Sequence, residues 1–112
     1  MADKSGCSLI WQERYRQVHE EGWTPEHDDE HDCSEMTMAA SAYAWAAQCA
    51  ASMQVDKDSD LDRWIPEYWP WSKDWWKPSA DPIRNLVKAG ALIAAEIDRL
   101  QRAARNGGNV TE

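Results

Sequence analysis

Residues 20–35 concentrate acidic and imidazole side chains more densely than any other stretch of the chain. Eight carboxylates and two histidines fall within sixteen positions. Like charges this close repel one another, so cations, arginine side chains or bulk solvent must offset them. Carboxylate oxygens are the ligands that Mg²⁺ and Mn²⁺ prefer. We therefore predict that a divalent ion, Mg²⁺ or Mn²⁺, could be held by Glu21, Asp28, Asp29, His31 and Glu35.

The two histidines of this loop, His27 and His31, are four residues apart. In a helix this spacing puts both imidazoles on one face, where a softer ion such as Zn²⁺ could bind. A structural zinc site needs two further ligands, and the spacing does not supply them. A solvated acidic loop without any metal is the alternative interpretation.

Tryptophan is the second unusual feature, with eight Trp and no Phe in 112 residues. Five of them lie between Trp64 and Trp76. Indole faces can stack on a nucleobase. Most of these rings are expected to fill a core that lacks Phe or to cover an interface between subunits, and one or two are expected to line a base pocket.

Basic residues of the last predicted helix supply a third candidate. Arg84 and Lys88 are one turn apart and could bind phosphate, or they could neutralise the acidic loop. Combined with the aromatic residues, they give a predicted site for a nucleotide or another phosphorylated small molecule. Its candidate ligand-binding residues are Arg14, Gln17, Trp23, His27, Trp71, Trp75, Arg84 and Lys88.

Helical periodicity predicts the elements that position these residues, and no segment has the pattern of a strand. We predict an all-α domain over 1–112, with main helices at 8–21, 33–54 and 81–105 and a short helical turn within 24–31. A Trp/Pro-rich irregular segment covers 55–81, and 106–112 form a flexible tail. N-caps are predicted at Ser8, Thr24, Asp32 and Asp81. A chain of this size often gains stability as an oligomer, so we expect a homo-oligomer.

Apolar residues form a stripe on each of the two terminal helices. The first carries Trp11, Tyr15 and Val18, and the last carries Ile83, Leu86, Val87, Gly90, Ile93, Ala94, Ile97 and Leu100. The opposite surface of the last helix holds Arg84, Asn85, Lys88, Glu96 and Arg99. Gly90 is expected where another helix passes close. The middle helix is apolar on most sides, which is typical of a central helix.

Charge and composition exclude several classes of protein. The formal net charge of −8 repels bare phosphates, so direct nucleic-acid binding is not expected. No apolar run is long enough to cross a bilayer, and the first residues do not resemble a signal peptide. Three cysteines without a CxxC pair favour a reducing, cytoplasmic location. Phosphate-binding loops and the common hydrolase motifs are absent from the sequence.

Two stretches of the chain resemble small proteins encoded by bacterial phages and prophages. They are ERYRQ at 13–17 followed by EGWTPEHDDEH at 21–31, and RNLVKAGALIAAEIDRL at 84–100. The intervening WPW and WWKP fit the same family. This resemblance implies a phage origin and the cytoplasm of an infected host.

More distantly, the layout is similar to MazG-like all-α nucleotide pyrophosphohydrolases. Those enzymes hold Mg²⁺ around a nucleoside triphosphate with EExxE and ExxD motifs. Here the second helix offers only Glu35, and Asn85 and Lys88 stand where ExxD is expected. Lysine cannot ligate Mg²⁺. Either the acids of 20–35 supply a rearranged metal site, or the scaffold binds a nucleotide without cleaving it.

The sequence therefore leaves two functions open. The first is a phage nucleotide-binding protein that sequesters a nucleotide signal of host defence or hydrolyses a nucleotide with a divalent metal. The alternative is an acidic anti-defence protein that binds a host defence protein directly by mimicking DNA.

Overall fold

The computed structural model describes residues 3–53 and 65–107, and in this part of the chain the structure is helical, without strands. The helices are α1 (Gly6–His19), α2 (Pro25–Asp28), α3 (Glu35–Met53) and α4 (Pro82–Arg105), with a 3-10 turn η2 at Lys73–Trp75. The predicted all-α class, with three main helices and one short turn, is confirmed. Part of the predicted 55–81 segment and most of the predicted tail lie outside the described residues.

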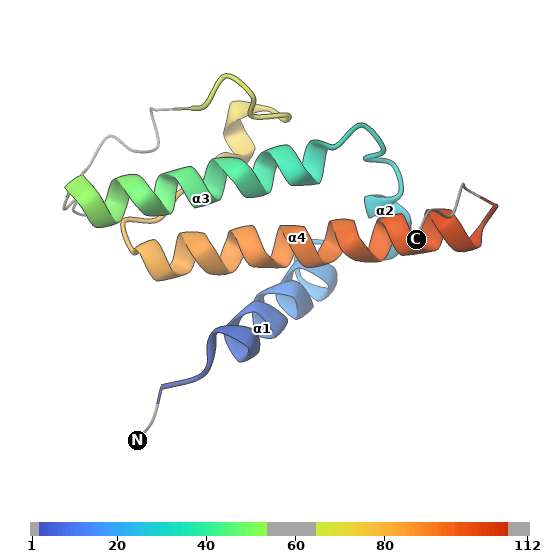
Figure 1. Cartoon of the computed structure of the whole chain (residues 1–112), viewed down its shortest axis with the longest axis horizontal. Coiled ribbons are helices and arrows are strands. Elements are labelled where there is room, and N and C mark those ends of the chain that lie inside the picture. Colours follow the sequence, from blue (N-terminus) through green and yellow to red (C-terminus); the bar gives the residue numbers. More distant parts are fainter. Residues whose placement is uncertain (1–2, 54–64, 108–112) are drawn as a thin grey trace.

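Helices α3 and α4 lie side by side and run in opposite directions, and α1 crosses α4 obliquely (Figure 1). Alanines make the close approach of α3 and α4 possible. Ala39, Ala42 and Ala46 of α3 are completely buried, and Ala91 of α4 is as well. Helices that meet through small side chains approach closely. The prediction that α3 is the central helix is wrong, because in the described part of the chain α4 is the helix that packs against α1, α2 and α3.

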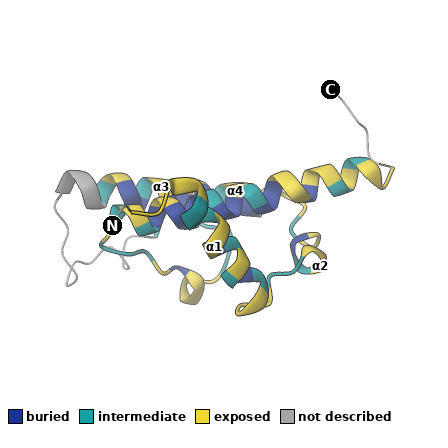
Figure 2. Cartoon of the chain, turned by 90° about the horizontal axis from the view of Figure 1, so that it is seen from below, coloured by how far each residue is buried: buried dark blue, intermediate teal, exposed yellow. Residues whose placement is uncertain are grey.

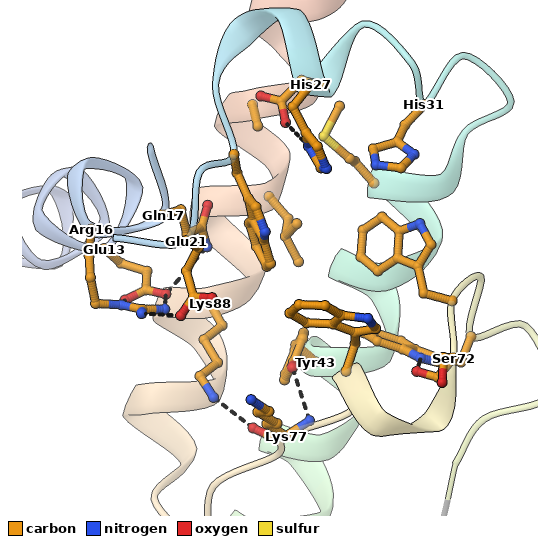
Figure 3. A pocket seen from close by; sticks show the side chains of 18 residues that line it. Glu13, Arg16, Gln17, Glu21, His27, His31, Tyr43, Ser72, Lys77 and Lys88 are labelled. Carbon is orange, nitrogen blue, oxygen red and sulfur yellow. Dashed lines mark hydrogen bonds and ion pairs between the residues drawn. The ribbon is translucent and has the colours of Figure 1, made fainter. Parts of the chain in front are cut away.

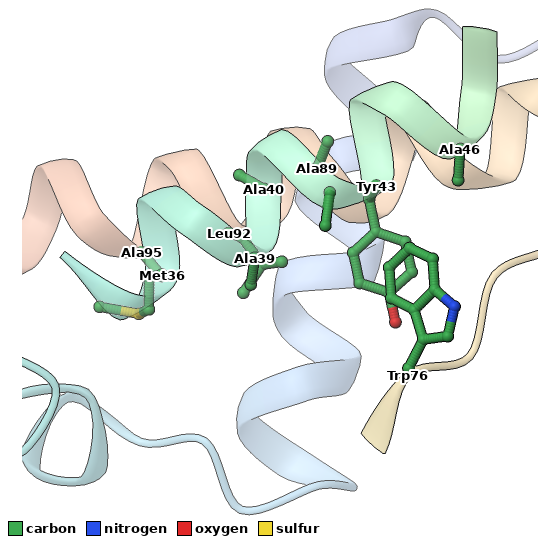
Figure 4. Close-up of a cluster of buried hydrophobic side chains, with 10 residues drawn as sticks. Met36, Ala39, Ala40, Tyr43, Ala46, Trp76, Ala89, Leu92 and Ala95 are labelled. Atoms are coloured by element: carbon green, nitrogen blue, oxygen red, sulfur yellow. The ribbon is translucent and has the colours of Figure 1, made fainter. Parts of the chain in front are cut away.

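The core cluster is completed by larger side chains at its centre (Figure 4). Met36 and Tyr43 project from α3, and Leu92 projects from α4. Trp76 comes from the segment after η2 and is only 4% exposed, packed against Tyr43 with ring centroids 5.0 Å apart. The Trp/Pro segment thus closes one side of the helix pair.

Capping residues fix the ends of the helices. The Thr24 side chain accepts a hydrogen bond from His27 N at 3.3 Å, and Asp81 Oδ1 accepts one from Ile83 N at 2.9 Å, as predicted. Two predicted caps are wrong. Helix α1 begins earlier, with Ser5 as the cap, and Glu35 accepts the hydrogen bond of Cys33 N at 2.6 Å without Asp32 capping α3.

Gly90 lies at the crossing of α1 and α4, as its position in an apolar stripe predicts. A Cβ at this residue would lie 2.6 Å from Ile10 Cδ1 and 2.9 Å from Ile10 Cγ1. Glycine therefore allows α1 to pass over α4, and this crossing places the polar side of α1 beside α4.

The apolar stripes face in an unexpected direction. Trp11 is 66% exposed and Tyr15 is 54% exposed, whereas Glu13 and Gln17 are the buried residues of α1. On α4 the surface that carries Asn85, Glu96 and Arg99 is buried, and aliphatic residues of the stripe are exposed along the helix (Figure 2): Ile83, Leu86, Ile93, Ile97 and Leu100. Apolar stripes ordinarily face a core. Most of this stripe faces outward because α3 occupies the polar side, where Glu96 is held by Arg99. Its exceptions are Val87, which is buried, and Gly90, which lies beneath Ile10 of α1.

Candidate functional site

A cavity of about 410 Å³ lies where all four α-helices and the Trp/Pro segment meet (Figure 3). This volume is in the range of pockets that bind small molecules. Its walls are aromatic and its rim is charged. The lining residues are Glu13, Arg16, Gln17, Glu21, Trp23, His27, Asp28, His31, Met36, Tyr43, Trp69, Trp71, Ser72, Trp75, Lys77, Lys88, Leu92 and Ala95.

Aromatic rings form the largest wall of the cavity. Trp71 contacts Trp69 with ring centroids 5.4 Å apart and faces Trp23 at 6.5 Å. Tyr43 meets Trp69 edge to face at 5.7 Å. Edge-to-face contacts at these separations are favourable and hold each ring in one orientation. The wall is therefore a set of indole and phenol rings that support one another.

Hydrogen bonds fasten this aromatic wall to the helices. Lys77 N donates to Tyr43 Oη at 3.2 Å, which ties the Trp/Pro segment to α3. Trp69 Nε1 donates to Ser72 O at 3.1 Å. Trp23 N donates to Gln17 O at 2.9 Å, which fixes the chain after α1. The rings that line the cavity thus come from three segments, each anchored by a backbone or hydroxyl hydrogen bond.

Two imidazoles stand at one end of the cavity. His27 and His31 lie edge to face with ring centroids 5.0 Å apart, as their spacing predicts. His31 also packs against Trp71 at 5.2 Å, and its Nδ1 lies 3.4 Å from Glu35 Oε2. This end offers nitrogen atoms that can donate or accept a hydrogen bond according to the tautomer.

Cationic groups stand at the other end, away from the histidines (Figure 3). Lys88 Nζ donates to Lys77 O at 2.6 Å and lies 5.3 Å from the centre of the Tyr43 ring. Burial, followed by the positive charge of Arg84, lowers the pKa of Lys88 from 10.5 to about 8. An ammonium group that is short of negative partners is a suitable place for an anion to bind.

Buried polar residues of α1 link the cavity to the rest of the protein. Glu13 is 4% exposed and accepts hydrogen bonds from Arg16 at 2.9 Å, and Arg84 Nη1 lies 2.8 Å from its Oε1. Burial alone would raise the pKa of Glu13, but the hydrogen bonds from Arg16 and Arg84 outweigh it and lower the pKa. Arg16 also pairs with Glu21 at 2.7 Å.

Six of the eight predicted ligand-binding residues line the cavity: Gln17, Trp23, His27, Trp71, Trp75 and Lys88. The other two lie behind the wall. Arg14 binds Asp28 and donates to Trp23 O at 3.2 Å, and Arg84 binds Glu13. Both arginines therefore support cavity residues and do not line the cavity themselves.

The predicted metal ligands are not gathered at one point. Glu21 pairs with Arg16, and Asp29 pairs with Arg102 at 2.8 Å. Asp28 is buried beside Arg14, and this burial raises the pKa of Asp28 even though Arg14 opposes the shift. Arginines thus offset much of the repulsion that the sequence indicates.

Within 3–53 and 65–107, the ligand atoms close enough to share one ion belong to Asp32, Cys33 and Glu35, at the surface. Only Glu35 of the predicted set is among them. Exposed acids often cluster without binding metal, and nothing else at this cluster indicates an ion. The Mg²⁺ or Mn²⁺ ion stays a prediction.

Several cavity residues were not predicted, among them Tyr43, Trp69 and Arg16. Tyr43 belongs to the apolar run of α3, and its hydroxyl group is the one sign that it could face a polar site. Arg16 and Glu13 sit in the string ERYRQ, where acid and base three residues apart indicate an ion pair on one helix face.

No protein-family model, curated protein or solved structure matches this chain. None of the helices in the described part of the chain has the length and apolar character needed to cross a lipid bilayer.

Proposed function

We propose that this protein binds a nucleotide, with the base against the indole rings of the cavity and the phosphate at the cationic end. The observation that carries the proposal is the combination of these two ends in one cavity of about 410 Å³. Trp23, Trp69 and Trp71 offer aromatic surface, and base–aromatic stacking contributes about 1–3 kcal/mol per base. Lys88 offers a half-buried ammonium group to the phosphate.

Binding without cleavage is the form of the proposal that the geometry supports best. Hydrolysis by a metal ion needs carboxylates that are free to coordinate it. Glu21, Asp28 and Asp29 have arginine partners. The resemblance of the chain to phage proteins then suggests that the nucleotide is a signal of host defence, which the protein sequesters.

The first experiment is calorimetric titration with nucleoside mono-, di- and triphosphates and cyclic dinucleotides, each with Mg²⁺ and with EDTA. We expect at least one of these ligands to bind in EDTA and to be recovered intact. Recovery of phosphate or pyrophosphate only with Mg²⁺ would favour the hydrolase instead. If none of the nucleotides releases heat or raises the unfolding temperature, the proposal fails.

Matched variants locate the binding site. Trp71→Ala should weaken binding at least about tenfold through lost stacking, and Trp11→Ala, which removes an exposed ring outside the cavity, should leave it unchanged. Lys88→Met should likewise weaken binding, whereas Lys73→Met on the exposed turn should not. Equal effects within either pair would place the binding site elsewhere.

The DNA-mimicking inhibitor stays an alternative. Glu20, Glu26, Glu30 and Asp32 are exposed acids that a basic groove could contact. The arginine partners of Glu21 and Asp29 reduce the negative field that such a mimic needs. A salt-sensitive complex with a host nuclease that survives Trp71→Ala would favour the inhibitor.

A further inference from the structure

Gln17 presents a hydrogen-bond acceptor of fixed orientation at the cavity. The residue is 2% exposed, and its Nε2 donates to Glu13 Oε2 at 3.3 Å. A carboxylate paired with two arginines only accepts hydrogen bonds, so the amide must turn its NH₂ group toward Glu13. The carbonyl oxygen Oε1 is left without a hydrogen-bond partner in the protein.

Two other buried polar atoms of the cavity lining also make no hydrogen bond within the protein. They are Trp71 Nε1, which can only donate, and His27 Nδ1, which can donate or accept and lies 3.8 Å from Asp28 Oδ1, beyond hydrogen-bond distance. Trp76 Nε1 lacks one too, but its ring belongs to the core and does not line the cavity. Unpaired buried polar groups are costly, so these atoms specify the hydrogen bonds that a ligand must make.

We propose that the cavity recognises the edge of a nucleobase that carries an N–H donor and an acceptor. The N–H, which in adenine belongs to the exocyclic amino group, donates to Gln17 Oε1, and a ring nitrogen or carbonyl oxygen of the same base accepts from Trp71 Nε1. This inference rests on the proposed nucleotide binding and adds the recognised edge of the base to it. The base of purine riboside has no N–H donor and does not meet the requirement.

The test compares adenosine 5′-monophosphate with purine riboside 5′-monophosphate, which differs only in lacking the amino group. We expect the adenine nucleotide to bind about tenfold more tightly, the effect of one neutral hydrogen bond to a buried acceptor. Equal affinities of these two nucleotides overturn the selectivity but leave nucleotide binding intact, whereas no binding by either of them defeats both.

Variants show which atoms discriminate. Gln17→Met keeps the length of the side chain and removes the amide, so it should lower the affinity for the adenine nucleotide and leave that for purine riboside unchanged. Trp71→Phe removes the N–H but keeps an aromatic ring, and it should weaken both ligands alike. Far-UV circular dichroism and the unfolding temperature report whether each variant is folded. A preference for the amino group that persists in folded Gln17→Met refutes the role of Gln17.

Discussion

Nucleotide binding should be coupled to the uptake of a proton by Lys88. In the free protein, burial and the neighbouring Arg84 lower the pKa of Lys88 from 10.5 to about 8. A phosphate beside this ammonium group favours its charged form and returns the pKa toward 10.5. Lys88 molecules that are neutral before binding must then take up a proton when the nucleotide binds.

The amount of proton uptake follows from these two pKa values. The neutral fraction of a group with a pKa of about 8 is about 0.1 at pH 7, about 0.5 at pH 8 and about 0.9 at pH 9. The uptake per bound nucleotide should follow the same numbers. The association constant should fall about tenfold between pH 7 and pH 9, since neutral Lys88 must first be protonated.

Calorimetric titration at pH 8 in buffers of different ionisation enthalpy measures this uptake directly. The phosphate monoester of the ligand has a second pKa near about 6, so it contributes little at this pH. Lys88→Met should bind more weakly, show no proton uptake and lose the dependence on pH between 7 and 9. An observed heat that is independent of the buffer for the wild-type protein would refute a phosphate at Lys88.

Three further predictions concern the framework around the cavity. Gly90→Ala should lower the free energy of unfolding by about 1 kcal/mol, because the clash with Ile10 exceeds the gain in helix propensity. Adding Ile10→Ala to the same chain should remove part of this loss. If urea titrations showed that Gly90→Ala stabilises the protein, they would contradict the close crossing. Glu13→Ala should lower the free energy of unfolding by about 2 kcal/mol, because Arg84 loses its carboxylate partner and Arg16 is left with Glu21 alone. Because folding lowers the pKa of Glu13, the contribution of this carboxylate to the stability of the wild-type protein is fully present above pH 4.5 and is lost as the pH falls through the folded-state pKa. Thermal unfolding of Glu13→Gln should not show this loss of stability in acid. Asp81→Ala should lower the free energy of unfolding by about 1 kcal/mol because the helix cap is lost, and Asp81→Asn should lower it much less. Equal losses of stability in the two variants would mean that the cap does not act through its acceptor oxygen.

Local signals in the sequence predict much of this fold because short-range chemistry produces it. Thr24 before Pro25 and Asp81 before Pro82 begin helices through hydrogen bonds to the second or third backbone amide beyond the cap. Gly22 ends the region of α1 with a φ of 76°, a conformation in which glycine is unstrained. Gly90 marks the helix crossing because only a residue without Cβ fits beneath Ile10.

Long-range arrangement is the part that the sequence does not predict. Periodicity shows that α4 has an apolar stripe, but it does not show which element covers it, and α3 packs on the other side. The ion pair of Asp29 with Arg102 joins residues 73 positions apart, so no local pattern indicates it. The sequence also does not show that Trp76 lies in the core and Trp71 at the cavity. Their positions depend on how the Trp/Pro segment packs on α3, where Lys77 N donates a hydrogen bond to Tyr43.

Helix α4 has three sides with different neighbours, and this limits how its sequence can change. Ala91 is buried, Lys88, Leu92 and Ala95 border the cavity, and Ile93 and Ile97 face outward. A rotation of the helix about its axis would move all three sides together. Saturation mutagenesis of residues 83–100 should therefore find few positions that accept every amino acid, and the substitutions accepted should differ in kind from one side to the next.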